Sequence, residues 1–213
     1  MIIDLIIKGG PIMIPIILLS IIALALILER VWTLWRVRLD IGQFAQEIFL
    51  YLERGHFQKA LERCGKVRHP IADVFKLGIL NRLMKREELE KMLEREGDEQ
   101  IHDLERYLGG LIVIIGVEPM LGFLGTIVGL IKAFMAWEQL GSNITVSALA
   151  AGIYQAMITT AAGLIIAIPY YVIYHLIVGK IKGHAQEMTY YGNELLDILA
   201  RVKDVGMKEV GKR

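Results

Sequence analysis

Runs of apolar residues long enough to cross a lipid bilayer occur three times along the chain. The first covers residues 9–28 without a charge and would span ~30 Å as a helix, about one hydrocarbon thickness. The second, from about 107 to 131, holds one charged residue, Glu118. The third, from about 147 to 179, holds no Asp, Glu, Lys or Arg. The pattern therefore predicts three transmembrane helices, of which the third is long enough to project beyond the lipid.

The first apolar run also resembles the core of a cleaved signal peptide. It is longer than the apolar region of such a peptide, and Glu29 and Arg30 follow it where small residues would mark a cleavage site. We therefore expect it to be a membrane helix.

The remaining segments have the periodicity of helices, so the fold class predicted is all-α. A first helix should end near Gly55, a second should cover residues 56–66, and Pro70 should open a third. Residues 86–108 place apolar side chains at helical spacing, and we expect this helix to run into the second span without much interruption. The amphipathic tail should continue the third span.

Lysine and arginine are distributed unevenly between the connecting segments, which predicts the orientation. Segment 30–109 holds 15 of them and segment 180–213 holds seven, whereas 137–147 holds none, and basic loops stay in the cytoplasm. The expected organisation is an outside N-terminus with the first transmembrane helix (1–29), a cytoplasmic helical domain (30–109), a second transmembrane helix (110–136), a short periplasmic loop (137–147), a third transmembrane helix (148–179) and a cytoplasmic C-terminal helix (180–213).

Composition narrows the function classes. The chain is 54% hydrophobic and has a net charge of +1, which favours a membrane protein and gives no reason to expect nucleic acid as a partner. The single cysteine and five scattered histidines form no metal-ligand spacing. No phosphate-binding loop or nucleophile–base pair is visible. We expect no catalytic residue, no metal and no cofactor, and hence no enzyme.

Two threonines should lie at the same depth in the membrane. Thr126 is eleven residues, ~17 Å, from the outer end of its span near Trp137, and Thr160 is twelve residues, ~18 Å, from Ala148. If the spans bundle, their hydroxyls would form a polar ring. The alternative is that each hydroxyl only satisfies a backbone carbonyl of its own helix, as is common in membrane helices.

These spans carry two motifs in the order and separation of a known family. "PMLGFLGTIVGLIKAF" followed by "GIYQAMITTAAGLIIAIP" resembles the ExbB/TolQ proteins, inner-membrane subunits related to the flagellar stator protein MotA. Three spans, an outside N-terminus and a large cytoplasmic loop fit ExbB and TolQ, whereas MotA-type stators have four spans.

The resemblance implies the pore-forming subunit of a motor that uses the proton-motive force to energise cell-envelope processes. Such subunits assemble as a pentamer in the bacterial inner membrane around an ExbD/TolR-like partner, whose single span carries an intramembrane Asp. By resemblance, the pore or proton path would include Thr126, Thr160, Thr159, Gln155 and Glu118. Helix packing would use Gly122, Gly125, Gly129, Gly163, Pro119 and Pro169.

Two positions depart from the family pattern. Gln155 stands where the family has a glutamate, so it keeps hydrogen bonding but cannot titrate. Glu118 precedes Pro119, where many relatives have a small apolar residue. It would line a cytoplasmic vestibule of the ion path, pair with a basic group across a subunit interface, or simply be wet near the membrane boundary. Lys132 is expected to extend to the outer surface.

Two other function classes stay open on the residues alone. One is a self-sufficient oligomeric channel or transporter subunit, which the lack of a carboxylate in the third span disfavours. The other is a flagellar-stator-like scaffold whose cytoplasmic helices dock soluble proteins. The motifs are also compatible with either an ExbB or a TolQ role, and with H⁺ or Na⁺.

Overall fold

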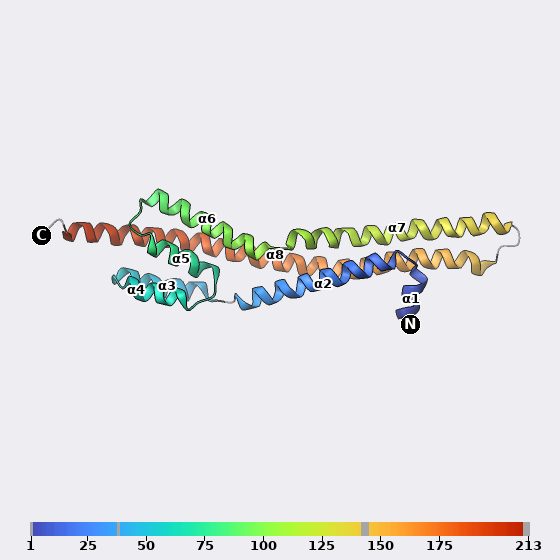
Figure 1. The fold of residues 1–213 in the computed structure, drawn as a ribbon, viewed down its shortest axis with the longest axis horizontal. Helices are drawn as coiled ribbons and strands as arrows, with labels where there is room; N and C mark the ends of the chain where they lie inside the picture. The colour runs from blue at the N-terminus through green and yellow to red at the C-terminus, as the bar shows by residue number, and fades with distance from the viewer. Residues whose placement is uncertain (1, 38, 142–144, 211–213) are drawn as a thin grey trace. The chain divides into compact units, whose positions relative to one another are not determined.

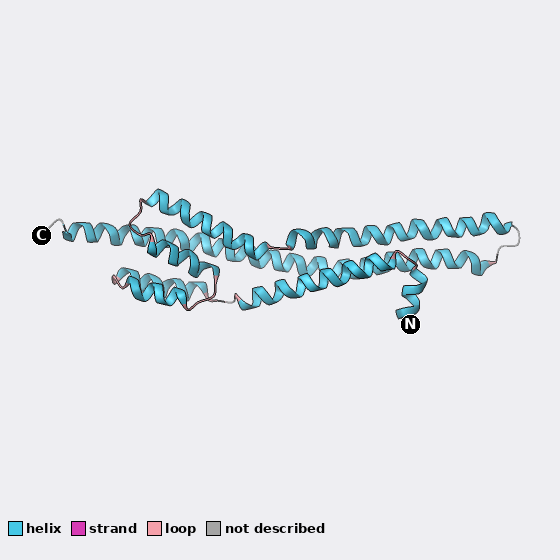
Figure 2. Cartoon of the chain, viewed as in Figure 1, coloured by secondary structure: helices cyan, strands magenta, loops and turns pink. Residues whose placement is uncertain are grey.

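The computed structural model of the chain describes residues 2–37, 39–141 and 145–210. Over these residues it is all helical, as predicted, and contains no strand (Figure 2). The helices are α1 (Ile2–Gly9), α2 (Met13–Arg36), α3 (Ile41–Glu53), α4 (Phe57–Gly65), α5 (Pro70–Leu80), α6 (Arg86–Glu105), α7 (Leu108–Leu140) and α8 (Val146–Val210).

The chain divides into two compact units. The first unit comprises Met1–Arg30 and Tyr107–Leu176, and the second comprises Val31–Arg106 and Ile177–Arg213. These borders fall within a few residues of those predicted between membrane and cytoplasm, although the assignment of each unit to its compartment stays a prediction.

Three helices make up most of the first unit. The segments of α2 and α7 that belong to it run along α8 (Figure 1). The Tyr170 hydroxyl of α8 donates to the Ser20 carbonyl of α2 at 3.3 Å. Large apolar side chains point away from these contacts, among them Leu18, Phe123, Phe134 and Ile165. Such a surface fits lipid rather than water. Three helices of the described residues are long and apolar enough to cross a membrane, so the prediction of a multi-pass membrane protein is confirmed.

The second unit has a conventional hydrophobic core. Helices α3 to α6 and the C-terminal part of α8 contribute buried side chains to one cluster. At its centre the ring of Phe75 lies 5.9 Å from that of Phe44 and 5.6 Å from that of Phe49, centroid to centroid. Aromatic pairs at this spacing add to the stabilisation from burial itself.

Local signals in the sequence explain where the helices of this unit begin and end. The Asp40 carboxylate caps α3 by accepting the Gln43 backbone N–H at 3.0 Å. Gly55, just beyond α3, has a φ of +74°, a left-handed conformation that glycine adopts without steric cost. Pro70 occupies the first turn of α5, as predicted, and the His69 ring caps that helix.

The junction between α6 and α7 differs from the prediction. The two helices are separated at Arg106 and Tyr107, because Tyr107 has a left-handed φ of 68°. Its carbonyl oxygen accepts the Leu111 backbone N–H at 3.0 Å and starts the new helix. The Arg30 guanidinium lies 5.5 Å from the centre of the Tyr107 ring, so a tertiary contact accompanies the break. The helical periodicity continues through the break and gave no sign of it.

The turn between the second and third spans is shorter than predicted. α7 extends to Leu140 and α8 begins at Val146, so both ends of the expected loop 137–147 are helical. Residues 142–144 of that loop lie outside the described residues. α8 then continues as one helix to Val210, as expected for a tail that prolongs the third span.

Candidate functional site

Helices α7 and α8 meet along a stripe of buried residues, most of them small, which we call the α7–α8 seam. It recurs every three or four residues on each helix, as one face of a helix requires. Its members are Leu111, Ile115, Glu118, Gly122, Gly125, Gly129 and Ala133 of α7, and Gly152, Ala156, Thr159, Gly163 and Ala167 of α8. All four glycines predicted to pack lie in it.

The glycines of the seam bring the two backbones into direct contact. A Cβ atom on Gly129 would lie 2.6 Å from the Gly152 carbonyl oxygen, and one on Gly163 would lie 2.7 Å from the Glu118 carbonyl oxygen. Both distances are shorter than real Cβ contacts, so any larger residue would push the helices apart. Small residues at four-residue spacing allow this approach in membrane helices.

The hydroxyls of Thr126 and Thr160 meet across α7 and α8. The two Oγ1 atoms are hydrogen-bonded to each other. The Thr160 hydroxyl also lies 3.1 Å from the Gly122 carbonyl oxygen, to which it can donate, and the Thr126 hydroxyl lies 3.4 Å from the same oxygen. Thr126 thus contacts a carbonyl of its own helix, whereas Thr160 contacts one of the neighbouring helix. A polar ring formed by several helices stays a prediction.

Thr159 has a different environment from its neighbour. It is fully buried, and its hydroxyl donates within α8 toward the carbonyl oxygens of Gln155 and Ala156, each at 3.0 Å. Its side chain occupies the space that a Cβ on Gly125 would need. In a single chain Thr159 packs the seam, and its place in an ion path stays a prediction.

Gln155 is hydrogen-bonded to Lys132, a contact that the sequence did not predict. Lys132 is exposed and its Nζ donates to Gln155 Oε1 at 2.9 Å, and its extension to the outer surface stays a prediction. Gln155 itself is buried, and its Nε2 lacks a partner among the described residues. The Gly10 backbone packs on this amide, because a Cβ there would lie 2.8 Å from Nε2. The Gln155 side chain thus supplies a neutral acceptor to Lys132.

Glu118 is enclosed by its own chain. Its side chain has no exposed surface, and over the described residues neither carboxyl oxygen has a hydrogen-bond partner. Its backbone carbonyl lies against Gly163, and Tyr170 is an ionisable neighbour from α8. The alternative in which Glu118 is simply wet disagrees with this burial.

Two prolines lie inside the long helices. Pro119 falls within α7 and Pro169 within α8, and neither ends its helix. Because proline has no backbone N–H, the carbonyls of Ile115 and Ile165 cannot receive the usual helical hydrogen bond. Pro119 therefore weakens α7 next to the buried carboxyl of Glu118.

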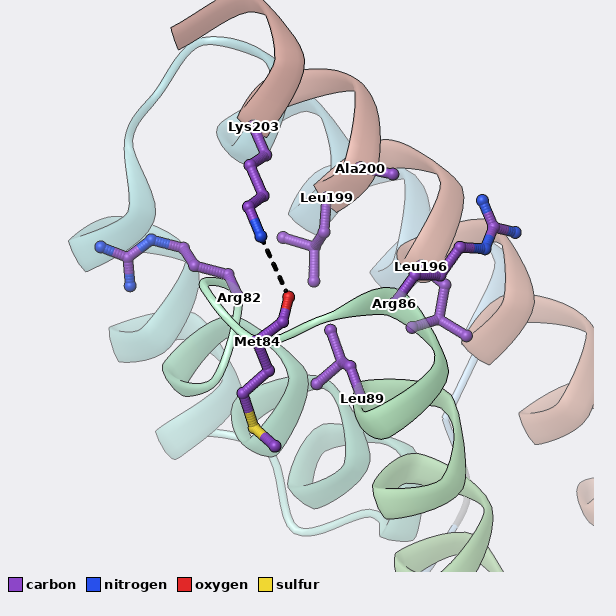
Figure 3. Close-up of a pocket in the computed structure, with 8 residues that line it drawn as sticks. All are labelled: Arg82, Met84, Arg86, Leu89, Leu196, Leu199, Ala200 and Lys203. Atoms are coloured by element: carbon purple, nitrogen blue, oxygen red, sulfur yellow. Dashed lines mark hydrogen bonds between the residues drawn. The ribbon is translucent and has the colours of Figure 1, made fainter. Parts of the chain in front are cut away.

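The second unit has surface cavities, but the described residues that line them form no recognisable catalytic or metal-binding group. One, about 230 Å³, is lined by leucines and three basic residues (Figure 3). Lys203 Nζ donates to the Met84 carbonyl oxygen at 3.1 Å, and Arg86 pairs with Asp197 at 2.6 Å. Arg82 donates to the Ile79 carbonyl oxygen at 3.2 Å, so all three cations are already engaged. Among the described residues no group of three His, Cys, Asp or Glu could hold a metal ion.

Sequence reasoning missed two residues of this site. Gly152 faces Gly129 across the seam, and its four-residue spacing to Ala156 was a usable signal. The orientation of Lys132 had no such signal, because only the packing of α7 on α8 brings Nζ to Gln155.

Comparison with known proteins agrees with this geometry. The chain is 32% identical over 198 residues to a protein of Methanothermobacter thermautotrophicus named as a homologue of the biopolymer transport protein ExbB, covering 90% of this chain and 70% of that protein. It is 33% identical over 198 residues to an ExbB-like protein of Synechocystis, covering 90% and 76%. Against the Tol-Pal system protein TolQ of Haemophilus influenzae the identity is 32% over 102 residues, covering 48% and 44%.

The match to the family itself includes both motifs. Residues 66–190, more than half of the chain, match the family described as the MotA/TolQ/ExbB proton channel family. That stretch contains the α7–α8 seam and the paired hydroxyls of Thr126 and Thr160. The chain belongs to the MotA/TolQ/ExbB proton channel family.

Proposed function

We propose that the chain is the pore-forming subunit of a membrane motor driven by the proton-motive force, and that it is not an enzyme. The observation that carries this proposal is the pair of hydroxyls of Thr126 and Thr160 midway along two membrane helices. Polar groups at such depth are costly and mark ion pathways.

The pair needs a carboxylate that α8 does not supply. The spanning part of α8 carries no Asp, Glu, Lys or Arg, and Gln155 cannot titrate. A single-span partner with an intramembrane Asp, as in ExbD or TolR, would place a titrating group beside Thr126 and Thr160. Both threonines keep partial exposure in the single chain, which leaves them accessible to such a helix.

The assembly we propose is a homo-oligomer, a pentamer by family resemblance, around that partner. It would lie in the bacterial inner membrane with the N-terminus outside and the C-terminus in the cytoplasm, since segment 30–109 and the tail carry most of the Lys and Arg. The names of its relatives, which concern biopolymer transport and the Tol-Pal system, support a role in energising transport or envelope integrity.

Proton flux into proteoliposomes under an imposed potential tests the proposal. The chain is reconstituted alone and with a co-expressed single-span partner, and wild type is compared with Thr160→Val. Valine keeps the volume of threonine and removes the hydroxyl. Flux should require the partner and should fall about tenfold or more in the variant, the effect of losing about 1.4 kcal/mol of transition-state stabilisation.

Two controls separate the hydroxyl from packing. Thr160→Ser restores the hydroxyl without the methyl group and should recover most of the flux. Thr189→Val removes an exposed hydroxyl of the second unit that donates to the Ala185 carbonyl, and it should change nothing. Conduction by the chain alone would favour a self-sufficient channel, and an indifferent Thr160→Val would leave Thr160 a packing residue.

A further inference from the structure

The proposed pore gives no role to Glu118, an acidic residue in a membrane helix. Thr126 and Thr160 receive the partner's carboxylate, whereas Glu118 lies two turns before Thr126 on α7 and is buried with no exposed surface. It belongs to the α7–α8 seam of a single subunit. The hydroxyl pair therefore does not explain why a carboxyl group lies here.

The surroundings of Glu118 hold no charge that could neutralise a carboxylate. The segments 13–28 of α2, 111–125 of α7 and 156–174 of α8 contain no Lys, Arg, His or other acidic residue. Over the described residues, both carboxyl oxygens are buried without a hydrogen-bond partner. An isolated ionised carboxylate in such a place is far more costly than a neutral carboxylic acid.

Neighbouring polar groups do not change this conclusion. Tyr170 is the ionisable group that faces Glu118 from α8, and its hydroxyl donates to the Ser20 carbonyl of α2 at 3.3 Å. Ser20 in turn donates to the Ile17 carbonyl at 2.8 Å. Both hydroxyls thus donate to backbone oxygens, and neither donates to the carboxyl group of Glu118.

Burial within one subunit also excludes a partner from another subunit. A basic group across a subunit interface would need an exposed carboxylate to contact, and Glu118 has none. A sodium ion would need several oxygen ligands around the carboxylate, as hard cations do. Residues 13–28, 111–125 and 156–174 offer no second carboxylate to such a site.

We propose that Glu118 is a proton-binding site enclosed within each subunit between α7 and α8, where it holds a neutral carboxylic acid and takes H⁺ rather than a metal cation. The site is separate from the Thr126–Thr160 pair, and the inference does not depend on the partner or on motor activity. Pro119 follows it directly and weakens the helix there, which gives the group a route to open and exchange its proton.

Infrared difference spectroscopy of the full chain in liposomes tests the site. The carbonyl stretch of a neutral carboxylic acid is separate from the carboxylate stretches. In the difference between wild type and Glu118→Gln at neutral pH, one carboxylic-acid band should be lost. The matched control is Glu138→Gln, an exposed glutamate near the end of the same helix, which should lose carboxylate bands instead. Loss of carboxylate bands in Glu118→Gln would overturn the proposal.

The choice of ion is tested in the same sample. Replacing choline chloride by sodium chloride at constant ionic strength should leave the carboxylic-acid band of wild type unchanged. Conversion of that band to carboxylate by Na⁺ would show a cation site and overturn the proposal. These results are independent of flux, so the proton site and the proposed motor function can fail separately.

Thermal unfolding in detergent gives a second readout. Glutamine resembles the neutral acid, so Glu118→Gln should unfold at the temperature of wild type, whereas loss of an ionised, paired carboxylate would lower it. If Glu118→Gln does not accumulate, wild type labelled with ¹³C at the glutamate carboxyls replaces it. A shifted carboxylic-acid band at neutral pH then supports the site, and its absence overturns it.

Discussion

At the scale of single residues, neighbouring positions along α7 and α8 serve different purposes: one pair of residues packs the helices together and the next pair forms a polar contact. Gly125 and Thr159 are paired so that the threonine side chain occupies the space beside the glycine. The next residue of each helix, Thr126 and Thr160, forms a pair through its hydroxyl instead. The seam therefore holds the helices together with Gly125 and Thr159 and leaves the other pair partly accessible.

This arrangement predicts the effect of enlarging Gly125. Gly125→Ala should destabilise the chain by about 1–3 kcal/mol, because an added methyl group in a packed interior forces side chains or backbone to move. Thr159→Gly in the same background should recover part of the loss, because it removes every side-chain atom that the methyl would meet. Thermal unfolding in detergent measures both. Equal loss in the single and double variants would show that the contact with Thr159 is not the cause.

At the scale of elements, helix ends in the second unit depend on contacts made by capping side chains. His69 is buried at the N-terminus of α5, and its Nδ1 accepts the Ile71 backbone N–H at 3.2 Å. Its ring lies 5.4 Å from that of His184 on α8. Burial, together with His184, lowers the pKa of His69 from 6.5 to about 4. A protonated ring would lose the cap, since Nδ1 would then carry a hydrogen.

The stability of this unit should therefore fall in acid. The unfolded chain takes up a proton at His69 near pH 6.5 and the folded chain only near pH 4. The contribution is complete above pH 6.5 and is lost as the pH falls toward 4, a loss on the order of 3 kcal/mol. Chemical unfolding at pH 7.5 and pH 5 should detect about 2 kcal/mol of this loss, because pH 5 lies between the two pKa values.

Substitutions identify the group responsible for this pH dependence. His69→Asn keeps a side chain that caps helices well and should flatten the dependence, whereas His102→Asn, at an exposed position of α6, should not. A dependence that survives His69→Asn would assign it to another group.

At the scale of the whole molecule, the uneven distribution of Lys and Arg between the connecting segments predicts the orientation in the membrane. Cysteine labelling can test this orientation, because the one native cysteine should not react. Burial raises the pKa of its single thiol, Cys64, to about 12, so little reactive thiolate is present. Native protein should therefore remain unlabelled by maleimide. Labelling of introduced cysteines can then be measured without removing Cys64.

Two exposed positions distinguish the faces of the membrane. Glu138→Cys, near the end of α7, should react with a membrane-impermeant maleimide in intact cells whose outer barrier is permeabilised. Gln186→Cys, in the part of α8 that belongs to the second unit, should react only after the inner membrane is opened. Unsubstituted protein is the control. The reverse pattern would contradict the predicted outside N-terminus and cytoplasmic tail.

Much of this molecule follows from short-range rules that a sequence displays directly. The three spans, the helical class, the start of α5 at Pro70 and the turn at Gly55 follow from apolar length, periodicity and the conformational limits of proline and glycine. The common depth of Thr126 and Thr160 follows from the constant rise of a helix. The family followed from motifs that lie in two of the spans.

What only the tertiary structure decided are the contacts between helices, because helical periodicity places a residue on a face without saying what that face meets. The break at Tyr107, the hydrogen bond of Lys132 to Gln155 and the seat of Thr159 against Gly125 each depend on how one element lies against another. Glu118 is the clearest case. Its sequence position allowed a wet, a paired or a path-lining carboxyl, and the close approach of α7 to α8 at Gly163 enclosed it within the subunit.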